Sequence, residues 1–175
     1  MQKTEKEYLI AEVKKWVIPR TFNHCIGVMN VMADLSGIYH LDKDKAIQAG
    51  LLHDIGKNLS IEDQLKYARI GNLHFNHDIE LRMPYIHGQV SAYLAKTVTK
   101  IIDESVLEAI STHTTYDIVS EDNHNLTWCL RIADVLAPEK NWIGMKKLKR
   151  FAYAGKFNEA KLLVTYWLRD RKSVV

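Results

Sequence analysis

The sequence predicts an all-α fold, a single helical bundle of about eight or nine helices. Apolar residues return every three or four positions along most of the 175 residues, which is the period of one face of an α-helix. Strand-like alternation of apolar and polar residues never lasts for a full segment. With only three prolines and eight glycines, the chain has no linker-like or repetitive tract, so we expect one domain over residues 1–175.

The first three predicted helices are delimited by a proline, a glycine and a capping aspartate. The first helix stops at Pro19 and the second at Gly37, while Asp42 can accept hydrogen bonds from the first turn of the third. Each helix is expected to bury one apolar face. These faces comprise Leu9, Val13, Trp16 and Val17, then Phe22, Ile26, Met29, Met32, Ala33 and Leu35, then Ala46, Ala49 and Leu52.

Local signals also delimit the helices in the middle of the chain. Ser60 and Asp63 resemble a capping box, and Gly71 is expected to end the helix that they begin. The polar, His-rich segment Asn72–Met83 is interpreted as a loop or one short helix. Pro84 suits a first helical position, before an apolar stripe of Ile86, Val90, Tyr93, Leu94 and Val98.

The C-terminal part continues the helical period. Asp103 is predicted to cap a helix, and residues 114–123 form a polar connection to a stripe that ends at Pro138. Two further helices are predicted over residues 142–153 and 157–169. The residues expected inside this part are Val106, Ala109, Ile110, Leu126, Cys129, Leu130, Ala133 and Leu136, together with Trp128, Trp142, Tyr153, Tyr166 and Trp167.

Composition excludes several classes of protein. The chain is 47% hydrophobic and 26% charged, which is typical of soluble globular proteins. A net charge of +3 is too small to indicate nucleic-acid binding, and the basic run at residues 146–150 is interpreted as a solvated helix face. No apolar run approaches the roughly 20 residues that a membrane span needs. Cys25 and Cys129 lie in helical patterns without paired spacing, so we expect no disulfide and a cytoplasmic location.

The clearest functional signal is a pair of polar residues inside an apolar segment, in AGLLHDIGK (residues 49–57). Burying His53 and Asp54 without partners would cost several kcal/mol, and a metal ion is the natural partner. If the helix ends there, His53 can face one metal while Asp54 bridges to a second, with the Lys57 cation over the site. A plain helix C-terminus, with His53 favoured by the helix dipole and Asp54 bonded to the turn, is the alternative.

Four more polar residues interrupt apolar stripes, each on a different predicted helix: His24, His87, His113 and Asp134. Each one alone is more often a core residue with a local partner. Together they indicate a nitrogen and oxygen ligand set without thiolate, which suits iron, manganese, zinc or nickel. The remaining histidines lie in polar segments and receive no role.

Taken together, the motifs resemble those of HD-domain metal-dependent phosphohydrolases, and in particular the YqeK branch. The resemblance runs from about Tyr8 to the C-terminal helices. It is carried by RxxxHxxGV from Arg20, AGLLHDIGK from Ala49, IHG from Ile86, AIxxHTT from Ala109 and IAD from Ile132. It implies a symmetrical dinucleoside tetraphosphatase, in which a metal-bound hydroxide attacks phosphorus and diadenosine tetraphosphate gives two ADP.

The resemblance also implies roles for individual residues. His24, His53, Asp54 and Asp134 would hold one metal ion, and Asp54 would bridge to a second ion held by His87 and His113. The two ions would be divalent or mixed-valence, with iron favoured and manganese, zinc, nickel or cobalt able to take its place. Asp54 and Lys57 would be catalytic. The expected substrate-binding residues are Arg20, Lys57, Thr114, Thr115 and Lys140.

Two positions depart from the family pattern, and several alternatives stay open. Thr115-Tyr116 stands where the family often has a glycine, and Pro138-Glu139-Lys140 stands where it tends to have arginine. Lysine lacks the planar fork of arginine, which affects base or ribose recognition more than metal binding. The alternatives are an HD phosphohydrolase acting on a nucleoside monophosphate or a guanosine alarmone, a catalytically silent nucleotide sensor, and a structural helical module. Homodimer formation is also left open.

Overall fold

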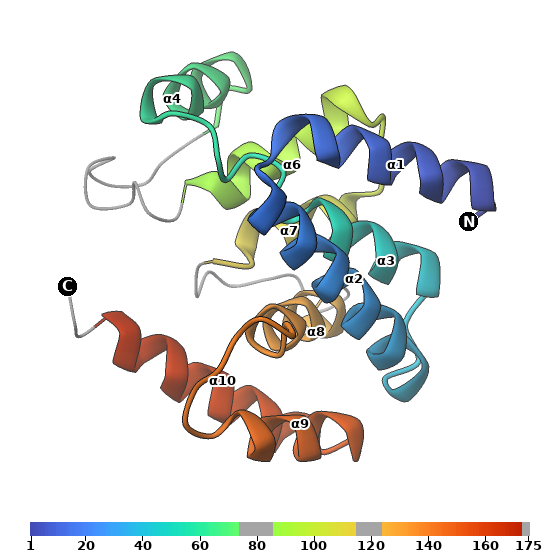
Figure 1. Cartoon of the computed structure of the whole chain (residues 1–175), viewed down its shortest axis with the longest axis vertical. Coiled ribbons are helices and arrows are strands. Elements are labelled where there is room, and N and C mark those ends of the chain that lie inside the picture. The colour runs from blue at the N-terminus through green and yellow to red at the C-terminus, as the bar shows by residue number, and fades with distance from the viewer. Residues whose placement is uncertain (74–85, 115–123, 173–175) are drawn as a thin grey trace.

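The fold of the chain, seen in a computed structural model, is entirely helical over the residues that the structure describes, 1–73, 86–114 and 124–172 (Figure 1). These residues form nine helices and no strand. The helices are α1 (Lys3–Trp16), α2 (Pro19–Ile38), α3 (Lys43–Leu52), α4 (Ile61–Ile70), α6 (His87–Val98), α7 (Glu104–Thr112), α8 (His124–Val135), α9 (Met145–Tyr153) and α10 (Phe157–Lys172). The predicted all-α class is therefore confirmed.

Helix α2 is the centre of the bundle. It packs along α3 and also contacts α8, while α7 packs against α3, α6 and α8. The α9–α10 pair covers α8 on one side, and α4 packs on α6 at the opposite end of the molecule (Figure 1). The side chains that fill the core are fully buried aliphatic residues from these helices, among them Met32, Leu35, Leu51, Leu52, Ile110, Leu130 and Ile132. Burial of each contributes roughly 1.5–3 kcal/mol to folding.

The three predicted N-terminal caps are confirmed. Asp42 accepts hydrogen bonds from the first turn of α3, and Asp103 does the same for α7. The Ser60 hydroxyl accepts from the Asp63 amide at 3.0 Å, which caps α4, and donates to the Asp63 carboxylate at 2.8 Å. Gly71 is the C-terminal cap of that helix. Local sequence therefore determines where these helices begin.

Several predicted boundaries were wrong by a few residues. Helix α2 does not stop at Gly37 but continues to Ile38, because Gly37 sits at the surface with helical geometry. Pro19 does not merely end α1, since it is the first residue of α2, where its missing amide hydrogen costs nothing. The helix expected from residue 142 starts at Met145, because Gly144 before it has a left-handed φ of 106°. Helix α10 extends to Lys172, and α8 already ends at Val135.

Two tyrosines that were expected in the core lie at the surface. Tyr166 is exposed, and Tyr153 is also exposed and donates a hydrogen bond to the Asp34 carboxylate. Both sit on α9 or α10, whose outer faces meet solvent. Trp128, Trp142 and Trp167 are half-buried and pack against the core.

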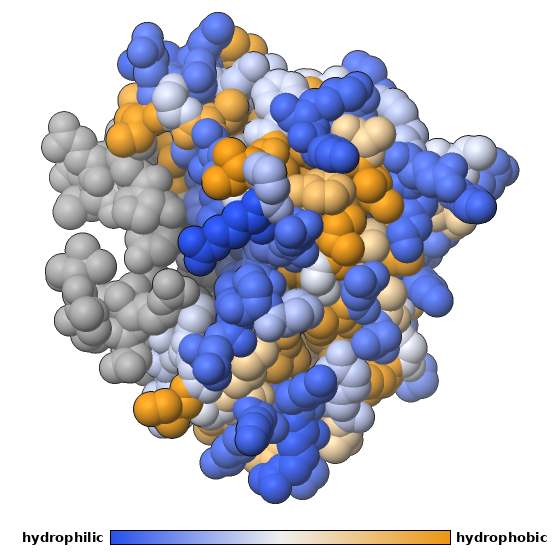
Figure 2. Space-filling model, viewed as in Figure 1, coloured by the Kyte–Doolittle hydropathy of each residue, from blue (hydrophilic) through white to orange (hydrophobic). Residues whose placement is uncertain are grey.

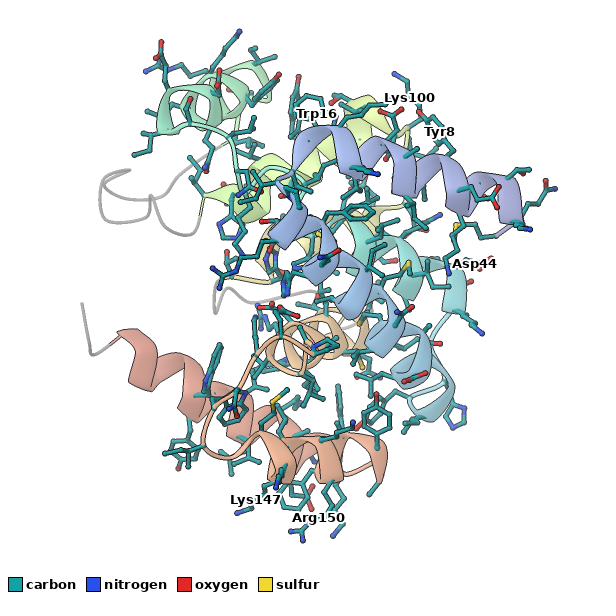
Figure 3. All side chains as sticks on the ribbon, viewed as in Figure 1. Tyr8, Trp16, Asp44, Lys100, Lys147 and Arg150 are labelled. Carbon is teal, nitrogen blue, oxygen red and sulfur yellow. The ribbon has the colours of Figure 1, made fainter. Side chains whose placement is uncertain are left out.

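The basic run on α9 is a solvated helix face, as predicted. Its four cations, Lys146, Lys147, Lys149 and Arg150, are all exposed. Lys147 and Arg150 project from the outer edge of α9, away from α8 (Figure 3). On the face shown in Figure 2, hydrophobic residues are scattered among hydrophilic ones. Within the helices that the structure describes, none is long and apolar enough to cross a membrane.

Some predictions fall outside the described residues. They are the Pro84 start of α6, most of the Asn72–Met83 segment, and the connection from Thr115 to residue 123. Among the described residues α6 begins at His87.

The Asp103 cap provides a stability prediction. Its carboxylate accepts from the amides of Ser105 and Val106 and pairs with the Lys45 ammonium at 2.8 Å. Asp103→Ala should lower the free energy of unfolding by about 1 kcal/mol at neutral pH. Urea denaturation measures this, with Glu104→Ala, in the same first turn, as the control that keeps the cap.

The contribution of the Asp103 carboxylate to stability should depend on pH. The hydrogen bond and charge of Lys45, with the Ser105 hydroxyl, lower the pKa of Asp103 to about 2. Because the folded-state pKa lies below the unfolded value near 4, its stabilisation is complete above about pH 4 and is lost as the pH falls toward 2. The difference in the free energy of unfolding between wild type and Asp103→Ala should therefore become smaller as the pH falls from about 4 to about 2. An unchanged difference at low pH would contradict the assignment.

Candidate metal centre

Five helices bring the six predicted ligands to one place. His24 lies inside α2, and His53 caps the C-terminus of α3 with Asp54 directly after it. His87 is the first residue of α6, and His113 caps the C-terminus of α7. Asp134 lies in the last turn of α8. The side chains of His53 and Asp54 are completely buried, as the sequence predicted.

Hydrogen bonds at the outer ring nitrogens orient three of the imidazoles. His53 Nδ1 donates to the Gly50 carbonyl at 2.9 Å, and His113 Nδ1 donates to the Ile110 carbonyl at 2.7 Å. His24 Nδ1 instead donates to the carboxylate of Glu139. In all three rings Nε2 is left to face the centre, which is the tautomer that a metal ligand needs.

A first group of ligand atoms surrounds His24 Nε2. It lies 3.2 Å from His53 Nε2, 3.0 Å from Asp134 Oδ1 and 3.5 Å from Asp54 Oδ2. His53 Nε2 in turn lies 3.4 Å from Asp54 Oδ2 and 4.0 Å from Asp134 Oδ1. Two imidazoles and two carboxylates therefore point their donor atoms at one small volume.

The other oxygen of Asp54 faces a second group. Asp54 Oδ1 lies 3.2 Å from His87 Nε2 and 3.6 Å from His113 Nε2. This buried oxygen has no hydrogen-bond partner of acceptable geometry among the described residues. The two oxygens of one carboxylate thus face two different pairs of histidines, which is the arrangement of a bridging ligand.

The donor set fits metal ions. Two ligand atoms that each lie about 2.1 Å from a shared ion are separated by roughly 3.0–3.4 Å, and most distances in the first group are of this size. Two overlapping triads, His24-His53-Asp134 and His53-Asp54-His113, have donor atoms within 4.8 Å of one another. Without an ion, Asp54 Oδ1 is a buried oxygen lacking its normal hydrogen bonds, which is costly.

Electrostatics favour the ionised form of both carboxylates and the neutral form of two imidazoles, whereas at His24 burial would lower the pKa but Asp134 raises it. Burial alone would raise the pKa of Asp54, but the neighbouring imidazoles of His53, His113 and His87 hold it well below its ordinary value. Burial lowers the pKa of His87 and of His113, which favours the neutral imidazole. Burial would also raise the pKa of Asp134, but the charges of Lys140 and His24 keep it low.

Two lysines reach the carboxylates of the centre. Lys57 Nζ lies 2.6 Å from Asp54 Oδ2, and Lys140 Nζ lies 2.5 Å from Asp134 Oδ1. The Lys57 side chain is 43% exposed, so its ammonium group is also accessible to a ligand from solvent. Burial would lower the pKa of Lys57, but Asp54 and Asp134 raise it, and the group stays charged.

Two of the other predicted substrate-binding residues, Arg20 and Thr114, are close to ligands along the chain. Arg20 is exposed on α2, one turn before His24. Thr114 follows His113 directly, and its hydroxyl lies 3.2 Å from where a Cβ on Gly88 would stand. Such a Cβ would also come within 2.9 Å of the Ser111 carbonyl. Glycine at 88 therefore lets α6 approach the end of α7 closely enough to bring His87 beside His113. Thr115 lies outside the described residues.

Sequence reasoning missed two residues that support the centre. Glu139 contacts His24 from a position 115 residues away, so no local pattern connects them. Arg131 is buried on α8 and donates to the Thr112 carbonyl at 2.7 Å, which fixes the end of α7 next to His113. One signal was available for Arg131. It is a charged residue inside the apolar run that also contains Asp134.

The model of the HD domain family matches residues 21–139, which is more than half of the chain and includes all six ligands. The chain belongs to the HD domain family. Membership supports a metal-dependent hydrolase, in agreement with the ligand geometry.

Individual relatives are similar over most of this HD-domain chain. The symmetrical bis(5'-nucleosyl)-tetraphosphatase of Halalkalibacterium halodurans is 28% identical over 78% of this chain and 71% of its own length. The Bacillus subtilis protein of the same name is 25% identical over 84% of this chain and 77% of its own length. A Mycoplasma genitalium protein named as a probable nicotinate-nucleotide adenylyltransferase/Ap4A hydrolase is 28% identical over 89% of this chain, which spans only 43% of that longer protein.

A solved structure has the same fold. A crystal structure from Clostridium acetobutylicum, described as a predicted HD superfamily hydrolase involved in NAD metabolism, superposes with a TM-score of 0.84 at 28% identity. The match covers 96% of this chain and 86% of that one.

Proposed function

We propose that this protein is a symmetrical dinucleoside tetraphosphatase, which hydrolyses diadenosine tetraphosphate and related compounds to two nucleoside diphosphates. The observation that carries the proposal is the bridging geometry of Asp54, whose two oxygens face two different pairs of histidines. The names of the relatives from Halalkalibacterium and Bacillus support this choice of substrate among HD-domain hydrolases.

In this proposal His24, His53, Asp54 and Asp134 hold one metal ion, and Asp54, His87 and His113 hold a second. When bound, such a pair lowers the pKa of water and neutralises charge on phosphate oxygens. We propose iron as the physiological metal, since the ligand set has nitrogen and oxygen donors but no thiolate. Manganese, zinc, nickel and cobalt suit the same donors.

The chain's own cations bind and orient the substrate. Lys57 holds its charge close to Asp54 and can move from that carboxylate to a phosphate oxygen, where it stabilises the transition state. Arg20 lies on the same side of α2 as His24, because residues four apart share a helix face, and its fork suits a second phosphate. Lys140 and the Thr114–Thr115 hydroxyls complete the proposed substrate contacts.

The activity test is hydrolysis of diadenosine tetraphosphate by protein reconstituted with iron, manganese or cobalt, with the products separated by chromatography. We expect two ADP for each substrate molecule. AMP together with ATP would reject symmetrical cleavage while keeping a hydrolase. Phosphate or pyrophosphate released only from other nucleotides would support the alternative HD phosphohydrolases, and nucleotide binding without turnover would support a sensor.

Lys57 gives a sharper prediction for the same reaction. Lys57→Ala should lower kcat/KM by about a hundredfold, the usual effect of removing one charge-stabilising donor, while the metal content stays at the wild-type value. Lys57→Arg should recover part of the loss. The control is Lys66→Ala, an exposed lysine on α4. If Lys57→Ala retained full kcat/KM, the role of Lys57 at the phosphate would be wrong.

A further inference from the structure

We propose that Glu139 is a positioning residue, whose carboxylate holds the His24 ring and thereby raises the affinity of the first ligand group for a divalent metal ion. The inference rests on the proposed metal centre, but it concerns a residue outside the ligand set. Glu139 lies in the turn after α8, and its side chain is 39% exposed, so its exposure alone does not distinguish it from other surface carboxylates.

The three oriented histidines differ in the group that accepts the Nδ1 hydrogen. His53 and His113 donate their Nδ1 hydrogens to neutral backbone carbonyls three residues earlier in their own helices. His24 donates to a carboxylate from another part of the chain. A charged acceptor makes a stronger hydrogen bond, fixes the ring orientation and makes the opposite nitrogen a better metal ligand.

The turn after α8 contacts two ligands at once. A hydrogen bond of 2.9 Å from the Lys140 amide to the Ala137 carbonyl closes this turn. Glu139 then reaches His24, and Lys140 reaches Asp134 at 2.5 Å. Since His24 Nε2 and Asp134 Oδ1 lie 3.0 Å apart, one short turn sets the relative position of both ligands.

Helix α2 leaves space for this turn at Gly27. Gly27 lies three residues after His24, so both are on the same face of α2. A Cβ at position 27 would stand 2.7 Å from Pro138 Cδ and 3.8 Å from Glu139 Oε2. The proline ring could not avoid such a contact without moving the turn. Gly27 therefore allows Glu139 to reach His24.

The test is a titration of the metal-free protein with Zn²⁺ in competition with a chromogenic chelator. His24→Ala identifies the phase of the titration that belongs to the first group. Glu139→Ala should weaken that phase by about tenfold to a hundredfold, while Glu139→Gln, which can still accept the hydrogen bond, should recover part of the affinity. Glu62→Ala, an exposed carboxylate on α4, is the charge-matched control and should change nothing.

A second variant tests the same contact without removing a charge. Gly27→Ala should displace the turn and weaken the same phase, and Gly27→Ala/Glu139→Ala should be no weaker than Glu139→Ala alone. Additive losses would contradict a shared contact. If Glu139→Ala bound Zn²⁺ with wild-type affinity, the inference would be wrong. It would also be wrong if both phases were weakened equally and the metal-free protein lost stability to the same extent, because Glu139 would then support the fold and not the first group.

The result is independent of the proposed substrate, because Zn²⁺ binding is measured without nucleotide. If Glu139→Ala weakens the first phase and diadenosine tetraphosphate is not cleaved, the positioning role stands and the proposed activity fails. If wild type cleaves the nucleotide and Glu139→Ala binds Zn²⁺ as wild type does, the proposed activity stands and the positioning role fails.

Discussion

Asp54→Ala is expected to remove both metal ions and to lower the hydrolysis of diadenosine tetraphosphate by at least about a thousandfold. The reason is that Asp54 contributes to both ligand groups, with Oδ2 near His24 and His53 and Oδ1 near His87 and His113. Loss of several kcal/mol of charge stabilisation in the transition state corresponds to a rate loss of about this size. Metal content by mass spectrometry and product formation by chromatography measure the two effects.

Asp134→Ala is the matched control for this prediction. Its carboxylate faces the first group, with Oδ1 at 3.0 Å from His24 Nε2. We expect Asp134→Ala to lose one ion and to keep the ion at His87 and His113. If Asp54→Ala instead retained both ions, Asp54 would not be a bridging ligand, and the proposed function would lose its main support.

The largest expected effect on stability comes from Gly50, where α3 crosses α2. An ideal Cβ on Gly50 would lie 2.9 Å from Met29 Cα, 3.0 Å from Met32 Cγ and 3.1 Å from Met29 N. Two of these atoms are backbone and cannot rotate away. Gly50→Val should therefore lower the free energy of unfolding by about 3 kcal/mol, a large part of the roughly 5–15 kcal/mol that holds a domain folded.

Gly37→Ala is the control, because Gly37 lies in helix α2 and a Cβ added there would meet no atom within 4 Å among the described residues. There the added methyl group should stabilise the protein by about 0.5–1 kcal/mol through helix propensity and a less flexible unfolded chain. Urea denaturation of the metal-free proteins compares the two variants. Equal stability of Gly50→Val and wild type would show that α2 and α3 separate more easily than their packing indicates.

Gly50 also connects stability to the metal centre. Its carbonyl accepts the hydrogen bond from His53 Nδ1, so a shift of α3 would turn the His53 ring. We therefore expect Gly50→Val to weaken metal binding even at low urea concentrations, where most molecules are still folded.

Much of the fold followed from local signals in the sequence. The helical period of the apolar residues was enough to predict an all-α domain. The capping residues were enough to predict the starts of α3, α4 and α7, because hydrogen bonds between residues close in sequence determine where these helices begin. Other helix boundaries were predicted less accurately. Gly37 is compatible with a helix interior, and the start of α9 depends on Gly144 and on Trp142, whose indole N–H donates to the Val135 carbonyl.

The identities of the six candidate ligands were also within reach of the sequence. A histidine or aspartate inside an apolar stripe is costly to bury, so its presence there indicates a partner. This argument identifies the residues one by one, and the resemblance to HD-domain proteins supplies their grouping. Neither could find Glu139, whose position in a polar turn carries no such cost.

The sequence by itself therefore determined the helical class, the starts of α3, α4 and α7, and the burial of His53 and Asp54, since these depend on neighbours along the chain. Only the tertiary structure decided which oxygen of Asp54 faces which histidines and that Glu139 contacts His24. The physical reason is that these contacts join α2, α3, α6, α7 and α8 across the core. Their geometry follows from how closely helices pack, which at Gly27, Gly50 and Gly88 depends on the absence of a single carbon atom.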